Sequence, residues 1–139
     1  MSQIVGAISE ISRRLRRCRS AYMEPLGLKG VHSRYLCEVC KAPGISQDRL
    51  AQRLGFDKSN VARQAAFLEE NGFLSRKPDG EDRRMLCLHP TQKTLELLPG
   101  LQKAVQAWED ALTQGLTQEE KAQFATLLSR VRREAERMD

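Results

Sequence analysis

Residues 46–72 read SQDRLAQRLGFDKSNVARQAAFLEENG, and this stretch decides the fold. Ser46 and Asp57 are residue types that commonly cap helix N-termini, and a helical pattern follows each of them. Gly55 lies between the two patterns and can adopt a positive φ without steric cost. Gly72 is a typical residue just beyond a helix end. The stretch therefore predicts two short helices joined by a tight turn, which is a helix-turn-helix.

The second of these helices has two unlike sides. Steps of four and three residues place Val61, Ala65 and Leu68 on one side, which we expect to be buried. The opposite side carries Ser59, Asn60, Arg63 and Phe67. A DNA major groove, about 12 Å wide, accepts a helix whose base-contacting side chains are slim or flexible. The small polar and basic residues meet that requirement.

A charged hairpin follows the two helices. Residues 73–77 and 85–89 have the pattern of short strands, and the turn-rich segment 78–84 joins them. A hairpin directly after a helix-turn-helix is a wing. The tip carries Arg83 and Arg84, whose guanidinium groups suit the negative potential of a narrow minor groove.

Helices are predicted on both sides of this region. Residues 4–24 repeat apolar side chains at helical spacing, residues 31–41 form a further helix, and helix returns from residue 91. We expect Pro99-Gly100 to kink or split that last helix, and Thr117 to open another. The predicted fold class is mainly α with a small β-wing. The domains are an N-terminal dimerisation helix (1–28), a winged helix-turn-helix (29–90) and C-terminal dimerisation helices (91–139).

These residues resemble the MarR (multiple antibiotic resistance regulator) family of winged-helix transcription factors. The resemblance rests on residues 44–51, 54–63, 68–74 and the Asp-Arg-Arg at 82–84. It implies a homodimer with intertwined first, fifth and sixth helices, and DNA contacts from Gln47, Lys58, Ser59, Asn60, Arg63, Gln64, Asp82, Arg83 and Arg84. Gln64 and Phe67 depart from the family pattern, in which an aliphatic and a polar or basic residue are usual. Phe67 would pack on a thymine methyl group or against the wing.

Charge and composition agree with a nucleic-acid partner. Residues 1–90 hold 16 Lys and Arg against 10 Asp and Glu, whereas residues 91–139 hold 7 against 8. This asymmetry favours a polyanion partner for the front and a protein partner for the rear, although a solvated Arg-rich surface is an equal alternative. The apolar runs fall far short of the ~18 residues of a membrane span. We expect a cytoplasmic protein, since no secretory signal is visible and the four cysteines suit reduced thiols.

The remaining candidate functional residues give weaker signals. Cys37 and Cys40 form a C-x-x-C inside a predicted helix, without the turns of a zinc site, so we expect no metal and no cofactor. Cys18 is either a small residue at the dimer seam or an oxidation sensor. The family resemblance implies a small anionic or phenolic effector, for which Arg16, Tyr22 and His32 are candidates. No catalytic set emerges, so we expect no enzyme.

The sequence as a whole predicts a DNA-binding transcription regulator. It would act as a ligand- or oxidant-responsive repressor and bind a pseudo-palindromic operator as a homodimer. Two alternatives remain open at this point. One is a winged-helix module that binds protein instead of DNA, and the other is a thiol-based redox sensor.

Overall fold

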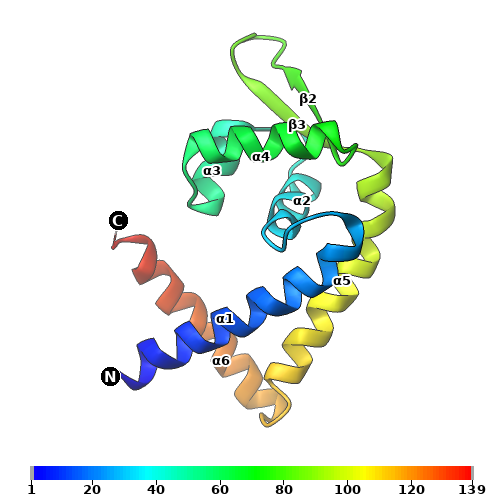
Figure 1. The fold of residues 1–139 in the computed structure, drawn as a ribbon. Coiled ribbons are helices and arrows are strands. Elements are labelled where there is room, and N and C mark those ends of the chain that lie inside the picture. Colours follow the sequence, from blue (N-terminus) through cyan, green and yellow to red (C-terminus); the bar gives the residue numbers. More distant parts are fainter. Residues whose placement is uncertain (1, 139) are drawn as a thin grey trace. The chain divides into compact units, whose positions relative to one another are not determined.

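The computed structural model describes residues 2–138 and is mainly helical, with a small β-sheet, as predicted (Figure 1). The elements in chain order are α1 (Gln3–Met23), the short 3-10 helix η1 (Glu24–Leu26), α2 (His32–Lys41), β1 (Ile45–Ser46), α3 (Gln47–Leu54), α4 (Lys58–Glu70), β2 (Leu74–Pro78), β3 (Leu86–Pro90), α5 (Gln92–Leu112) and α6 (Gln118–Glu136). The chain forms two compact units, of which the first ends at Ala104 and the second begins at Val105. The boundary therefore falls within α5.

The predicted helix-turn-helix is formed by α3 and α4. Ser46 caps α3 by accepting a hydrogen bond from the Arg49 backbone N–H, and Asp57 caps α4 in the same way through Asn60. Gly55 ends α3 with a φ of +70°, in the left-handed region that side chains other than glycine's rarely adopt. The turn residues foreseen from the sequence thus take the predicted conformations.

The sheet has one strand more than the sequence indicated. β2 and β3 form the expected antiparallel hairpin, with Arg76 opposite Leu88. β1 adds to the other edge of β3, in the order β1-β3-β2, and pairs Ile45 with Leu88. β1 has two residues, which is too short for any period-two pattern to be visible. Its effect is to fix the start of α3 to the base of the wing.

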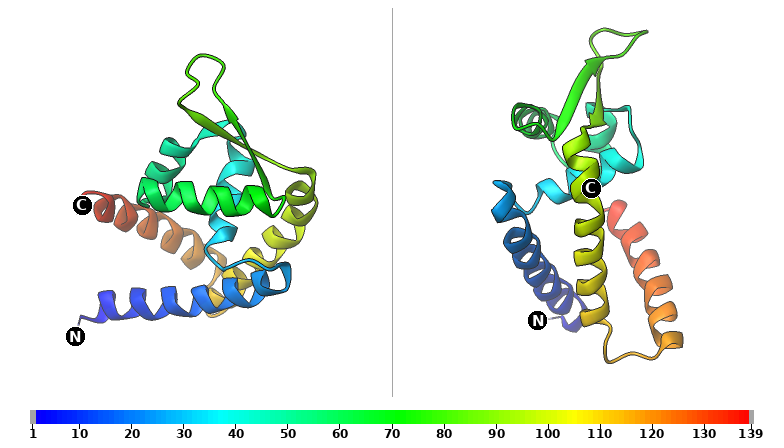
Figure 2. Two further views of the ribbon diagram at one scale, coloured as in Figure 1. Left: turned by 45° about the horizontal axis from the view of Figure 1, so that its top comes forward. Right: turned by 90° about the vertical axis from the view of Figure 1, so that its right-hand side faces the viewer.

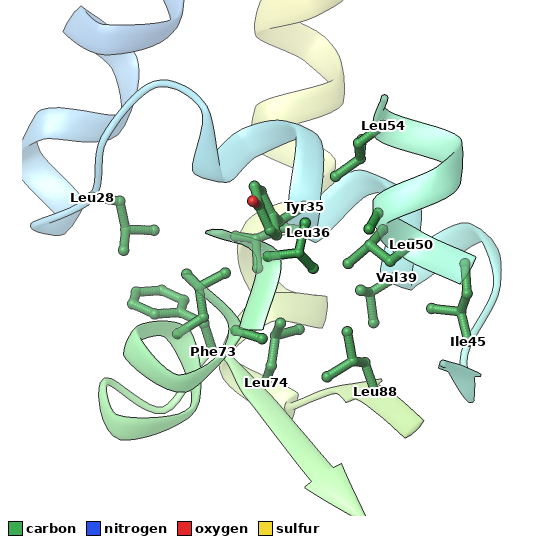
Figure 3. Packing of buried hydrophobic residues seen from close by; sticks show 14 of the residues in the cluster. Leu28, Tyr35, Leu36, Val39, Ile45, Leu50, Leu54, Phe73, Leu74 and Leu88 are labelled. Atoms are coloured by element: carbon green, nitrogen blue, oxygen red, sulfur yellow. The ribbon is translucent and has the colours of Figure 1, made fainter. Parts of the chain in front are cut away.

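The core of the first unit lies where α2, α3, α4 and the sheet meet (Figure 3). The apolar face predicted for the second helix of the helix-turn-helix is buried there, together with side chains from α1, α2, α3, α5 and the sheet. The buried set includes Leu50, Ala51, Leu54, Val61, Ala65, Leu68, Met23, Tyr35, Leu36, Val39, Phe73, Leu74, Leu88 and Leu101. Each fully buried leucine contributes about 1.5–3 kcal/mol to folding. This burial fixes the rotation of α4 about its own axis.

Of the two outcomes expected at Pro99-Gly100, a kink or a split, the split does not occur. α5 continues through both residues as one helix of 21 residues with Pro99 inside it. Proline removes one backbone donor and strains the preceding turn, but neighbouring packing can hold the helix together. Gly100 provides that close packing, since a Cβ atom there would lie 2.9 Å from the Tyr22 hydroxyl oxygen of α1. Glycine therefore lets α1 approach α5 within the first unit.

His32 is a buried polar residue of this core, with 1% of its surface exposed. Its Nδ1 accepts the Lys29 backbone N–H at 3.0 Å, and its Nε2 lies 2.7 Å from Gln64 Oε1. Burial lowers the pKa of the imidazole below its ordinary value, the Gln64 hydrogen bond opposes this shift, and the Lys29 charge adds to it. His32 is therefore neutral in the folded protein at neutral pH.

We expect His32 to make the fold sensitive to mild acid. Above about pH 6.5 the imidazole is neutral in both the folded and the unfolded chain. As the pH falls below that value, the unfolded chain takes up the proton first, so the free energy of unfolding decreases until the lowered folded pKa is passed. Urea unfolding between pH 8 and pH 5 should show a smaller decrease for His32→Gln than for the wild type. His89→Gln, which removes the other of the two histidines, is the matched control and should keep the wild-type decrease. An unchanged decrease in His32→Gln would contradict this account.

Candidate nucleic-acid interface

α4 presents a polar face on the side away from the core. Lys58, Ser59 and Arg63 are exposed, and Asn60 is half-buried. Val61, Ala65 and Leu68 on the other side are fully buried, so the polar face cannot rotate inward. The N-terminus of α4 adds the positive end of the helix dipole to this face. Lys58 Nζ lies 3.6 Å from Asp48 on α3 in an exposed ion pair, an arrangement that contributes little stability.

Asn60 is held by two neighbours on α4. Arg63 Nη2 donates to Asn60 Oδ1 at 3.4 Å, and Gln64 Nε2 donates to the same oxygen at 3.5 Å. Gln64 itself is half-buried and hydrogen-bonds to His32 on α2. The sequence placed Gln64 among the DNA contacts, whereas the structure turns its carbonyl oxygen toward the protein interior.

Phe67 on α4 also contacts the buried histidine of α2. Its ring stacks on the His32 ring with centroids 5.2 Å apart and an angle of 16° between the planes. The sequence suggested a thymine methyl group or the wing as its partner, and in the structure the ring contacts His32 of α2. Phe67 keeps 38% of its surface exposed. The two residues that depart from the family pattern thus meet at the same buried histidine.

Gln47 is positioned by a residue that the sequence did not single out. Arg76 on β2 donates through Nη1 to Gln47 Oε1 at 3.2 Å and through Nε to Glu69 Oε1 at 3.1 Å. The Arg76 backbone N–H donates to the other oxygen of Glu69. One guanidinium thereby ties α3 and α4 to the wing. It occupies the carbonyl oxygen of Gln47, which leaves the amide NH2, a donor suited to a phosphate oxygen.

The wing tip carries exposed guanidinium groups. The hairpin β2–β3 projects from the first unit, as Figure 2 shows. Arg83 is exposed, and the Arg84 side chain is 95% exposed. Asp82 Oδ1 accepts the Arg84 backbone N–H at 3.0 Å and lies 3.6 Å from Arg84 Nε. Asp82 therefore orients the tip and leaves most of the guanidinium in solvent.

The structure does not support His32 as an effector contact. The ring is buried and both its nitrogens are engaged, so in this conformation it offers no free donor or acceptor to a ligand. Arg16 is exposed on α1, while Tyr22 and Cys18 on the same helix are half-buried. The four cysteines are free thiols, and burial raises the pKa of both Cys37 and Cys40. Neither of these two thiols has the lowered pKa of a reactive cysteine.

Residues 2–138 hold neither a metal-binding cluster nor a membrane-spanning helix. No group of three or more His, Cys, Asp or Glu side chains there is arranged to hold a metal ion. No helix in that part of the chain is long and apolar enough to cross a membrane.

Comparison with known proteins agrees with the geometry. Residues 26–85 match the MarR family. The HTH-type transcriptional regulator YybA of Bacillus subtilis, described as uncharacterized, is 31% identical over 137 residues, which cover 99% of this chain and 91% of that protein. A crystal structure of MarR is 33% identical with a TM-score of 0.88 and covers 99% of this chain and 96% of its own.

A further solved structure contains nucleic acid. A MarR-family regulator from Listeria monocytogenes, complexed with a 26mer DNA, is 25% identical with a TM-score of 0.91, covering 98% of this chain and 91% of its own. The similarity extends over the flanking helices as well as the winged helix. With its helix-turn-helix, its arginine-tipped wing and these relatives, the chain belongs to the MarR family of transcriptional regulators.

Proposed function

We propose that this protein binds double-stranded DNA in a sequence-specific manner, as a homodimer on a pseudo-palindromic operator. The observation that carries the proposal is the pairing of an exposed polar face on α4 with exposed guanidinium groups at the wing tip. Arg63, Arg83 and Arg84 have no buried carboxylate partner among residues 2–138, and their exposed positive charge is available for phosphates and base edges. The DNA complex of the Listeria relative supports the same role for this fold.

The two exposed elements contact different grooves of the DNA. α4 enters the major groove, where Ser59, Asn60 and Arg63 contact base edges or phosphates. The wing reaches the adjacent minor groove, whose negative potential attracts Arg84. Gln47 and Lys58 donate to phosphate oxygens and so fix the position of α4 without selecting a sequence. Asp82 keeps Arg84 in place, and Gln64 supports Asn60 from behind.

Unpaired apolar surface supports the homodimer. The first turns of α1 expose Ile4, Val5, Ile8 and Ile11, and α6 exposes Phe124, Leu127, Leu128 and Val131, each by at least 40%. Helices with this much unburied aliphatic surface need a partner. A second copy supplies a matching surface by symmetry. Two recognition helices would then lie one duplex turn, roughly 34–36 Å, apart.

We further propose that operator binding represses transcription and that a small ligand or an oxidant relieves this repression. A bound repressor excludes other proteins from its operator, and a ligand or oxidant that alters the spacing of the two α4 helices would weaken binding. Arg16 and Tyr22 on α1 are the remaining effector candidates, and a small anionic or phenolic molecule is the expected ligand. Cys18 on the same helix is the candidate for oxidant sensing.

The DNA-binding role is tested by two arginine substitutions. Arg63→Ala should weaken operator binding by about 1–3 kcal/mol and relax the base preference. Arg84→Ala should weaken binding to all sequences more evenly and make it less sensitive to salt. Fluorescence anisotropy with the DNA upstream of the protein's own gene, over a range of salt concentrations, measures both effects.

The matched control for these variants is Arg14→Ala. Arg14 is an exposed arginine of α1 that pairs with Glu10, so this substitution removes the same charge away from the proposed interface. It should leave binding unchanged. Unaltered DNA affinity in both Arg63→Ala and Arg84→Ala would rule out this binding mode and favour a protein partner for α4.

The dimer is tested on α6. Leu127→Asp places a charge in the exposed apolar face and should shift the mass measured by analytical ultracentrifugation from dimer toward monomer. Ala122→Asp adds the same charge on the opposite side of the helix, by its spacing of five residues from Leu127, and should leave the dimer intact. The unfolding temperature of the wild type should rise with protein concentration. A wild-type protein that sediments as a folded monomer would contradict the proposal.

Oxidant sensing is tested at Cys18. If its thiol senses peroxide, DNA affinity of the wild type should fall as peroxide is added, and Cys18→Ser should not respond. Cys87→Ser, which alters another half-buried thiol, is the control and should respond like the wild type. An identical peroxide response in Cys18→Ser would remove Cys18 as the sensor.

A further inference from the structure

A chain of hydrogen bonds runs from the backbone before α2 to the exposed face of α4. The Lys29 backbone N–H lies 3.0 Å from His32 Nδ1, His32 Nε2 lies 2.7 Å from Gln64 Oε1, and Gln64 Nε2 lies 3.5 Å from Asn60 Oδ1. His32 is buried in this chain, and Gln64 and Asn60 are half-buried. The chain ends at Asn60, which the proposed function places against the bases.

The direction of every bond in this chain follows from its first member. A backbone N–H can only donate, so the Nδ1 of His32 must accept and carries no proton. In a neutral imidazole the proton is then on Nε2, which donates to Gln64 and selects its carbonyl oxygen. Gln64 must therefore turn its NH2 toward Asn60, where the carbonyl oxygen accepts.

Arg63 favours the same orientation of the Asn60 amide group. Its guanidinium, which has donors and no acceptor, also lies against Asn60 Oδ1, at 3.4 Å. The Asn60 oxygen thus accepts from two sides. Its amide nitrogen Nδ2 has no hydrogen-bond partner within residues 2–138.

The His32 ring is itself fixed in place. Phe67 stacks on one of its faces at 5.2 Å, and Tyr35 meets it edge-on at 6.3 Å. Burial keeps the ring neutral by lowering its pKa, which preserves the proton arrangement that the chain needs. The packing and the hydrogen bonds therefore fix the ring orientation and the tautomer of His32.

We propose that the His32–Gln64 pair is a specificity device that makes Asn60 a donor-only contact to DNA, so that each half-site excludes cytosine at the base that Asn60 meets. This inference rests on the proposed function. An asparagine with both amide groups free contacts adenine through one donor and one acceptor. With its oxygen already occupied, Asn60 offers only N–H groups. In the major groove guanine, adenine and thymine each present an acceptor, whereas cytosine presents only its N4 amino donor.

Gln64 is then a positioning residue. Its replacement by glutamate should reverse the base preference at the position that Asn60 contacts. A carboxylate at position 64 still accepts from His32 Nε2 but cannot donate to Asn60. The Asn60 amide then turns its NH2 toward the carboxylate and its oxygen toward the DNA. Gln64→Glu should therefore favour bases that present an amino donor, namely cytosine and adenine.

The experiment is selection of bound duplexes from a random DNA pool by the full-length wild type and its variants, followed by sequencing. Asn60→Ala identifies the position that Asn60 contacts, because base preference disappears there. The wild type should deplete cytosine relative to guanine at that position by roughly three- to tenfold, the value of about one hydrogen bond. Gln64→Glu and Asn60→Asp should both reverse this ratio, and Gln64→Met should bring it close to one.

Two controls show whether a change in base preference comes from the orientation of the Asn60 amide, from the added charge or from a loss of folding. Gln102→Glu adds the same negative charge on the exposed surface of α5 and should keep the wild-type ratio. Each variant should unfold within a few degrees of the wild type by circular dichroism. Independently of DNA, the ring nitrogen shifts of His32 in NMR spectra should show the tautomer protonated on Nε2.

The possible outcomes are distinct. A wild type that selects a motif with no cytosine depletion at the Asn60 position overturns the inference but not the proposed function. The same holds if Gln64→Glu keeps the wild-type ratio, or if His32 is protonated on Nδ1. A wild type that selects no sequence from the pool overturns the proposed function and this inference with it.

Discussion

The burial of one side of α4 is the constraint on which the rest of the structure depends. Val61, Ala65 and Leu68 are fully enclosed by α2, α3 and the sheet, and truncating Leu68 to alanine would alone cost about 2–5 kcal/mol. The helix therefore has a single rotational setting. In that setting Ser59 and Arg63 face solvent, so the energetics of the core directly determine which side chains are available for DNA.

Polar contacts refine this setting without supplying much stability. Arg76 joins Gln47 and Glu69 on one side of α4, and His32 joins Gln64 on another. The neutral His32–Gln64 hydrogen bond is worth only about 0.5–1.5 kcal/mol net, and solvent screens the partly exposed ion pair of Arg76 with Glu69. Their value lies in direction, since a bound amide presents a defined donor or acceptor to its surroundings. The structure thus uses hydrophobic burial for position and hydrogen bonds for chemical polarity.

The wing tip, in contrast to α4, is held by exposed polar contacts. An ion pair as exposed as that of Arg84 with Asp82 adds almost nothing to folding. The weak pairing is useful for a DNA-binding tip, because the guanidinium stays hydrated and can exchange its carboxylate neighbour for phosphate at little cost. The backbone hydrogen bond from Arg84 to Asp82 maintains the turn in either state.

The sequence by itself determined the elements whose signals are local. The caps at Ser46 and Asp57, the turn at Gly55 and the hairpin all depend on neighbours a few residues away, and all were foreseen. Tertiary structure alone decided the pairing of β1 with β3, the continuity of α5 through Pro99 and the partners of Gln64, Phe67 and Arg76. Gln64 meets a histidine 32 positions away, and Arg76 a glutamine 29 positions away. No periodicity or composition encodes such pairs, because they exist only once the helices have packed.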